Sequence, residues 1–147
     1  MKLANNVNLR VFCKGDEDKK VIVDKLKALL PFDLEKEKIQ INSKTAEGFT
    51  NIPMEILSVT IVKERHVKVF LKLLAEKLGD EKKTLLEQAT TRLDDDLNFF
   101  IRLDKDMPLK DKFVLTDSGK CYHIKINIAA FPKKLEKGLE VLKEIFK

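Results

Sequence analysis

The sequence predicts one α+β domain over residues 1–147, with a single mixed or antiparallel sheet and helices mainly on one face. A chain of 147 residues suits one domain, and 44% hydrophobic residues are enough to form its core. Segments that alternate apolar and polar residues are interspersed with segments of helical period. Their order, β-α-β-β-α-α-β-β-β-α, implies an α+β arrangement.

The first half of the chain predicts three strands and a helix. Residues 6–14 alternate apolar and polar side chains, which is the period of a half-buried strand. A helix begins after Asp16 or Asp18 and ends at Pro31, because proline cannot continue a helix. The next segments are a short strand, a loop and a β-branched central strand: 38–42, 43–53 and 54–62.

The second half predicts three helices and three strands. Two helices follow closely, one over 63–78 that Gly79 stops and one that Asp80 caps. The remaining elements are a strand over 97–103, a hairpin of 112–115 with 121–129, and a last helix that Pro132 opens.

The charge is mildly basic. Lys plus Arg is 29 against 24 Asp plus Glu, a net charge of +5. The last 47 residues carry 11 of the basic and 7 of the acidic residues, so most of the excess gathers there. This balance permits nucleic-acid binding without requiring it. A heat-adapted or compositionally biased proteome would give a similar lysine-rich surface.

Several classes are disfavoured. The chain has no apolar run long enough to span a bilayer and no secretory h-region, so we expect a cytoplasmic protein. Nucleotide-binding and acyl-transfer motifs are absent, which predicts a protein without catalytic residues or a cofactor. Weaker alternatives are a Mg²⁺-dependent nuclease or a metal site, and they use these residues: Asp94–Asp96 with Asp104 and Asp106, and Cys121 with His123.

The final third carries the candidate RNA-binding residues. Cations hold phosphates and flat side chains stack on bases. Phe100 and Arg102 supply one of each on the outward side of strand 97–103. Arg102 is one of only four arginines, and a guanidinium can hold a phosphate through two bonds. Arg10 is its natural companion if the two strands are neighbours. The set is completed by Lys105, Lys125, Lys133, Lys134 and Lys137.

Simpler interpretations remain for these residues. Phe100 could be buried under a helix, and the lysines could merely solvate a surface that also bears Asp104, Asp106 and Asp111. The loop that holds Gly48 and Asn51 could contact RNA, but glycine and asparagine are also ordinary turn residues.

Three segments resemble the archaeal predicted RNA-binding, exosome-associated protein family. They are Asn98 to Lys105, His123 to Ile126, and Phe131 to Lys134 before an amphipathic helix. The resemblance implies a fold similar to the fifth large-subunit ribosomal protein, with one curved sheet. The resemblance also implies that Arg102, Asp104 and Lys105 are the polar positions that match the family. It likewise implies that the loop with Gly48 and Asn51 matches a loop of the family that contains Gly and Asn. The sequence departs from the family pattern after Lys105, where Asp106, Met107 and Pro108 follow.

We therefore expect a non-catalytic protein that binds structured or looped RNA without reading base sequence. The resemblance implies that the protein is an accessory to RNA processing or degradation, or to ribosome-related work. It names exosome subunits, or another protein, as the expected protein partners. The alternative is a protein-interaction module of an RNA-degrading complex, in which RNA contact is incidental.

Overall fold

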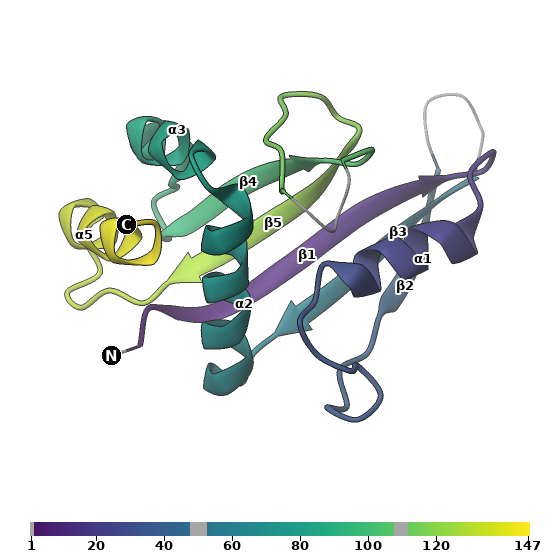
Figure 1. The fold of residues 1–147 in the computed structure, drawn as a ribbon, viewed down its shortest axis with the longest axis horizontal. Helices are drawn as coiled ribbons and strands as arrows, with labels where there is room; N and C mark the ends of the chain where they lie inside the picture. The colour runs from purple at the N-terminus through teal and green to yellow at the C-terminus, as the bar shows by residue number, and fades with distance from the viewer. Residues whose placement is uncertain (1, 48–52, 108–111) are drawn as a thin grey trace.

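In the computed structural model, one layer of helices covers one face of a five-stranded sheet (Figure 1). The structure describes residues 2–47, 53–107 and 112–147. Every strand pair is antiparallel, and the strand order across the sheet is β2-β3-β1-β5-β4. The α+β class and the single sheet expected from the sequence are therefore confirmed.

The strands alternate between a buried and a solvated side, as their residue pattern predicts. On β1, for example, Val7, Leu9 and Val11 are fully buried, while Arg10 between them is exposed. The strands have these bounds: β1 Ala4–Lys14, β2 Asn42–Glu47, β3 Pro53–Ile61, β4 Asn98–Asp104 and β5 Cys121–Ile128.

The helices supply the other half of the core. Asp18 caps α1, since its side chain accepts a hydrogen bond from the backbone N–H of Lys20 at 3.0 Å. On α2, Phe70 and Leu74 pack into the core and Gly79 ends the helix with φ 54°. The helices are α1 Lys19–Ala28, α2 Glu64–Leu78, α3 Glu81–Glu87, α4 Ala89–Arg92 and α5 Leu135–Ile145.

The helix boundaries differ slightly from the sequence-based expectation: Asp80 makes no side-chain capping hydrogen bond, the helix after it divides into α3 and α4, and α5 begins at Leu135 instead of Pro132. Two other segments differ more. The second strand lies at Asn42–Glu47, not at 38–42, so it takes up part of the predicted loop. Residues 112–115 do not form a hairpin with β5, because both sides of β5 are already paired, with β1 and with β4. They lie along the free edge of β4 instead, where the backbone N–H of Asp104 donates to the carbonyl of Val114 at 2.7 Å.

None of the helices in the described part of the chain is long and apolar enough to cross a membrane.

Candidate nucleic-acid interface

One face of the sheet carries no helix, and its side chains form the candidate site. We call this surface the open face. The register of the strands defines its members as Asn42 and Lys44 from β2, Met54, Ile56, Ser58 and Thr60 from β3, Asn8, Arg10, Phe12 and Lys14 from β1, Cys121, His123, Lys125 and Asn127 from β5, and Asn98, Phe100, Arg102 and Asp104 from β4.

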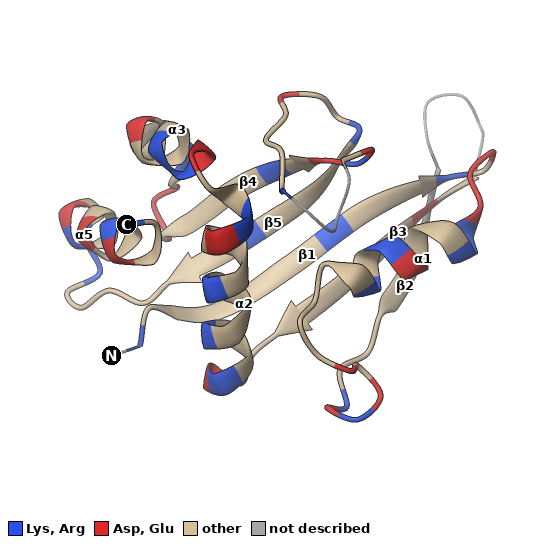
Figure 2. Ribbon diagram, in the orientation of Figure 1, with Lys and Arg blue, Asp and Glu red and all other residues tan. Residues whose placement is uncertain are grey.

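The open face is basic. Among its members in the described residues, five carry a positive charge and Asp104 alone carries a negative one. Figure 2 shows basic segments on the middle of β1, β4 and β5. Asp104 lies at the end of β4, away from the middle of the surface. The charge excess of the chain is therefore concentrated where the sheet meets solvent.

Arg102, His123 and Arg10 form one row across three strands. Arg102 on β4 pairs with His123 on β5, which in turn pairs with Arg10 on β1. The two arginines are thus not on neighbouring strands. Neighbouring strands lie about 4.8 Å apart, so the Cα atoms of the arginines are about 10 Å apart with the imidazole between them. Two guanidinium groups at this separation can hold successive phosphates of a backbone.

Aromatic rings accompany this row. The Phe100 side chain is 44% exposed, so it is not buried under a helix, and it pairs with Lys125 on β5. Phe12 meets His123 edge to face with 5.5 Å between the ring centroids, and the guanidinium carbon of Arg10 lies 5.6 Å from the Phe12 centroid. Exposed rings beside cations are the elements on which single-stranded bases stack.

His123 is uncharged near neutral pH. Burial lowers the pKa of its imidazole, and the positive charges of Arg10 and Arg102 lower it further. Its Nε2 atom lies 3.5 Å from the Sγ of Cys121. Burial raises the pKa of that thiol. The ring therefore offers a neutral stacking surface and a hydrogen-bonding nitrogen between two permanent cations.

Arg92 on α4 is a basic residue beside the open face that sequence reasoning missed. Its Nη1 donates to the backbone carbonyl of Phe100 at 3.2 Å, along the edge of β4. Burial lowers the pKa of Arg92, the Asp117 carboxylate opposes this, and the charge of Arg102 adds to the lowering. The guanidinium remains charged, as arginine does in proteins. Arg92 is one of only four arginines in the chain, and this observation, which drew attention to Arg102, could have identified Arg92 as well.

Lys105 is placed differently from its predicted role. Its side chain is only 5% exposed. The ammonium donates to both carboxylate oxygens of Glu17, at 2.8 and 2.7 Å, and to the Phe12 carbonyl at 2.8 Å. Burial alone would raise the pKa of Glu17, but hydrogen bonds from Lys105 and from the backbone N–H of Lys14 outweigh it and lower that pKa. Lys105 therefore joins β4 to the turn after β1 instead of presenting a cation to a ligand.

The other predicted residues are spread around the sheet. Lys133, Lys134 and Lys137 are exposed on the segment that leads into α5 and on its first turns. Lys133 pairs with Asp96 at 3.6 Å, which places this segment at the start of β4. The predicted contact at Asn51 lies outside the described residues.

The aspartates of the nuclease alternative lie at opposite ends of β4, with Asp94–Asp96 before the strand and Asp104 and Asp106 at its end. Asp94 caps the turn before the strand, since its carboxylate accepts hydrogen bonds from the backbone N–H groups of Asp96 and Asn98. Asp104 ends the strand, and its carboxylate accepts from the backbone N–H of Asp106 at 2.8 Å. Within the described ranges, no group of three or more His, Cys, Asp and Glu side chains could hold a metal ion.

Fold and site together define a two-layer α+β protein whose uncovered antiparallel sheet presents cations and rings to solvent. The chain belongs to the family described as RNA binding, whose model matches residues 6–129. This confirms membership of an RNA-binding family, and the family supports RNA as the partner.

Known relatives cover nearly the whole chain. The RNA-binding protein PAB1135 of Pyrococcus abyssi is 26% identical over 142 residues, which is 96% of this chain and 92% of the relative. The crystal structure of the DUF54 protein AF2318 from Archaeglobus fulgidus matches with a TM-score of 0.86 at 27% identity, covering 97% of this chain and 99% of that one.

A DUF54 protein from Methanothermobacter thermautotrophicus matches with a TM-score of 0.79 at 24% identity, covering 99% of both chains, and supports the fold alone. The names of these three proteins do not mention the exosome or a ribosomal protein, so both expectations stay predictions.

Proposed function

We propose that the open face binds the backbone and unpaired bases of structured or looped RNA, without reading base sequence and without catalysis. The row of Arg102, His123 and Arg10 carries this proposal, because it brings together two guanidinium groups from strands that are distant in sequence. Phosphate contacts position the strand, and Phe100 and Phe12 offer their rings to bases that leave the helix.

The remaining cations extend this footprint in two directions. Lys125 adjoins Phe100 on the neighbouring strand, so a phosphate beside a stacked base lies within its reach. Lys133, Lys134 and Lys137 lie toward the start of β4 and add positive charge at that end. Several amides and hydroxyls of the open face already bond one another, Asn8 with Thr60 at 2.9 Å and Asn127 with Asn98 at 2.8 Å, which favours recognition of shape and backbone over sequence.

Fluorescence anisotropy tests the proposal with a labelled stem-loop RNA, a matched single strand and a duplex DNA across a salt series. We expect micromolar or tighter affinity for one of the RNAs near physiological salt. Arg102→Ala removes one phosphate contact, so the slope of log affinity against log salt should flatten by about 0.7 for a single strand.

Lys72→Ala is the matched control, because Lys72 is an exposed cation on α2, on the helix side of the sheet. It removes the same charge from the opposite layer and should leave affinity and salt slope nearly unchanged. Equal losses in Arg102→Ala and Lys72→Ala would mean that only net charge attracts RNA, and would overturn the assignment of the open face.

We further propose that the protein acts as an accessory in RNA processing or degradation, as the family resemblance implies. A contact with exosome subunits is the related alternative. Phe131 favours a protein contact outside the open face, because its side chain is 93% exposed and that of Leu135, four residues later, is 48% exposed. Co-purification of the same partner after nuclease treatment, lost in Phe131→Ser, would support that alternative.

A further inference from the structure

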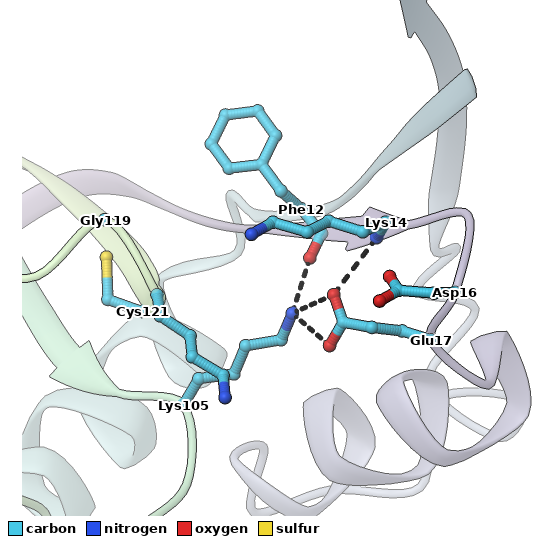
Figure 3. Close-up of a pocket in the computed structure, with 8 residues that line it drawn as sticks. Phe12, Lys14, Asp16, Glu17, Lys105, Gly119 and Cys121 are labelled. Atoms are coloured by element: carbon cyan, nitrogen blue, oxygen red, sulfur yellow. Dashed lines mark hydrogen bonds and ion pairs between the residues drawn. The ribbon is translucent and has the colours of Figure 1, made fainter. Parts of the chain in front are cut away.

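A cavity of about 230 Å³ adjoins the open face at the end of β1 (Figure 3). Pairing between β1 and β5 ends at Val11 and Tyr122, whereas β1 continues to Lys14 beside β3. The cavity lies where the two strands separate. Its walls come from the end of β1, the turn before α1, the residue after β4, and the segment from Gly119 to the first residue of β5. Phe12, Lys14 and Cys121 belong both to this lining and to the open face, so the two surfaces are continuous.

Some charged groups around the cavity already have partners. Glu17 and Lys105 hold each other, and Lys120 pairs with Asp106 at 3.1 Å. In contrast, the ammonium of Lys14 and the carboxylate of Asp16 have no hydrogen bond or ion pair with any described residue. Both residues are exposed. A cation and an anion whose charged groups make no hydrogen bond or ion pair with the described residues therefore line one small cavity.

We propose that this cavity takes the sugar-phosphate of one ribonucleotide, with Lys14 on the phosphate and the Asp16 carboxylate accepting the hydrogen of the ribose 2′-hydroxyl. This inference rests on the proposed function, since the strand reaches the cavity from the open face. Pockets for drug-sized ligands are larger, roughly 300–1,000 Å³, so the size suits a single nucleotide unit. Figure 3 shows the Phe12 ring pointing away from the Glu17–Lys105 pair, so the ring leaves this part of the cavity open.

The carboxylate is the informative group. A negative charge repels phosphate, so Asp16 weakens general binding of nucleic acid. It favours binding only where the ligand donates a hydrogen bond, and the 2′-hydroxyl is the donor that RNA has and DNA lacks. With DNA, the carboxylate loses water at the interface without gaining a partner, which is the more costly outcome. Asp16 is thus a specificity-determining residue for RNA over DNA.

The test compares the Kd values of an RNA strand and a DNA strand of identical base sequence, with deoxyuridine in place of thymidine. The readout is the ratio of the two Kd values, because a general electrostatic effect changes both and cancels. We expect Asp16→Ala to lower the preference for RNA by about tenfold, since a hydrogen bond to a charged group is lost. Asp24→Ala is the control, an exposed aspartate on α1 that does not line the cavity.

Lys14→Ala separates the two roles in the cavity. It should weaken RNA and DNA alike and leave their ratio unchanged, since Lys14 contacts the phosphate that both strands share. Single 2′-deoxy substitutions along the RNA should find one or two positions at which wild type loses affinity and Asp16→Ala does not.

The outcomes distinguish this inference from the proposed function. If RNA affinity depends on Arg102 but the RNA-to-DNA ratio is the same in wild type and Asp16→Ala, the cavity assignment is overturned and the open face stands. If Arg102→Ala leaves RNA affinity unchanged, the proposed function fails. Should Asp16→Ala and Asp24→Ala change the ratio equally, the effect is one of net charge and the cavity assignment is again overturned.

Discussion

The buried ion pair of Lys105 and Glu17 predicts that Lys105 acts on stability and not on RNA. Lys105→Met keeps most of the length of the apolar stem and removes the ammonium, which makes three hydrogen bonds of 2.7 to 2.8 Å. The substitution leaves the Glu17 carboxylate and the Phe12 carbonyl without this partner. Breaking a buried pair from one side costs about 3–5 kcal/mol.

The expected cost is smaller here because water can reach part of the carboxylate. The Lys105 side chain is 5% exposed but that of Glu17 is 24% exposed. We therefore expect a loss of about 2–3 kcal/mol in the free energy of unfolding. For a chain of this size, 1 kcal/mol shifts Tm by about 2–4 °C, so Tm should fall by roughly 4–12 °C.

Urea unfolding followed by circular dichroism measures this loss as a lower midpoint with an unchanged m value. The double variant Lys105→Met with Glu17→Gln should lose less than the sum of the single variants, because the remaining charge is also removed. RNA affinity, measured below the unfolding transition, should stay within about twofold of wild type. An unchanged midpoint with a tenfold loss of RNA affinity would refute the reasoning and return Lys105 to the binding surface.

Three further predictions concern titratable side chains. The Tyr122 hydroxyl is buried without a hydrogen-bond partner among the described residues, and burial raises its pKa to about 12. Tyr122→Phe removes this unsatisfied group and should raise the free energy of unfolding by about 1 kcal/mol. A lower urea midpoint for this variant would contradict the prediction. The pKa values of Glu17 and Asp94 are lowered on folding, so both carboxylates stabilise the fold above their unfolded pKa values. This stabilisation should be lost as pH falls below about 5, which urea unfolding at a series of pH values measures. A free energy of unfolding that does not change over this pH range would count against both hydrogen-bond networks. Phosphates that neutralise Arg10 and Arg102 should raise the lowered pKa of His123. RNA affinity should therefore increase from pH 7 to 5.5 more in wild type than in His123→Gln. The same dependence of RNA affinity on pH in both proteins would exclude proton uptake by His123.

Periodicity in the sequence was sufficient for the class of fold and for the faces of the strands. The alternation along residues 6–14 separates Val7, Leu9 and Val11 from Arg10, and the structure buries the first three and exposes the fourth. The same reasoning placed Phe100 and Arg102 on an outward face, where both are exposed. Such patterns depend on geometry within one strand, so the local sequence determines them.

The boundaries at the second strand and the pairing of residues 112–115 needed more than local pattern. A run of polar residues such as 42–47 forms a strand here because β3 supplies an adjacent edge to pair with. Residues 112–115 lie beside β4 because the edges of β5 are occupied. Pairing partners are distant in sequence, so their positions depend on the whole sheet.

The sequence by itself therefore determined the α+β class and the faces of the strands, including the outward positions of Phe100 and Arg102. Only the tertiary structure decided which residues meet. It inserts β5 between β1 and β4, which puts His123 between two arginines, and it carries Lys105 to Glu17 across 88 residues of sequence. Alternation of apolar and polar residues along a strand specifies the face on which a side chain lies. It does not specify which side chain lies beside it on the next strand, because the order of the strands depends on the packing of the complete core.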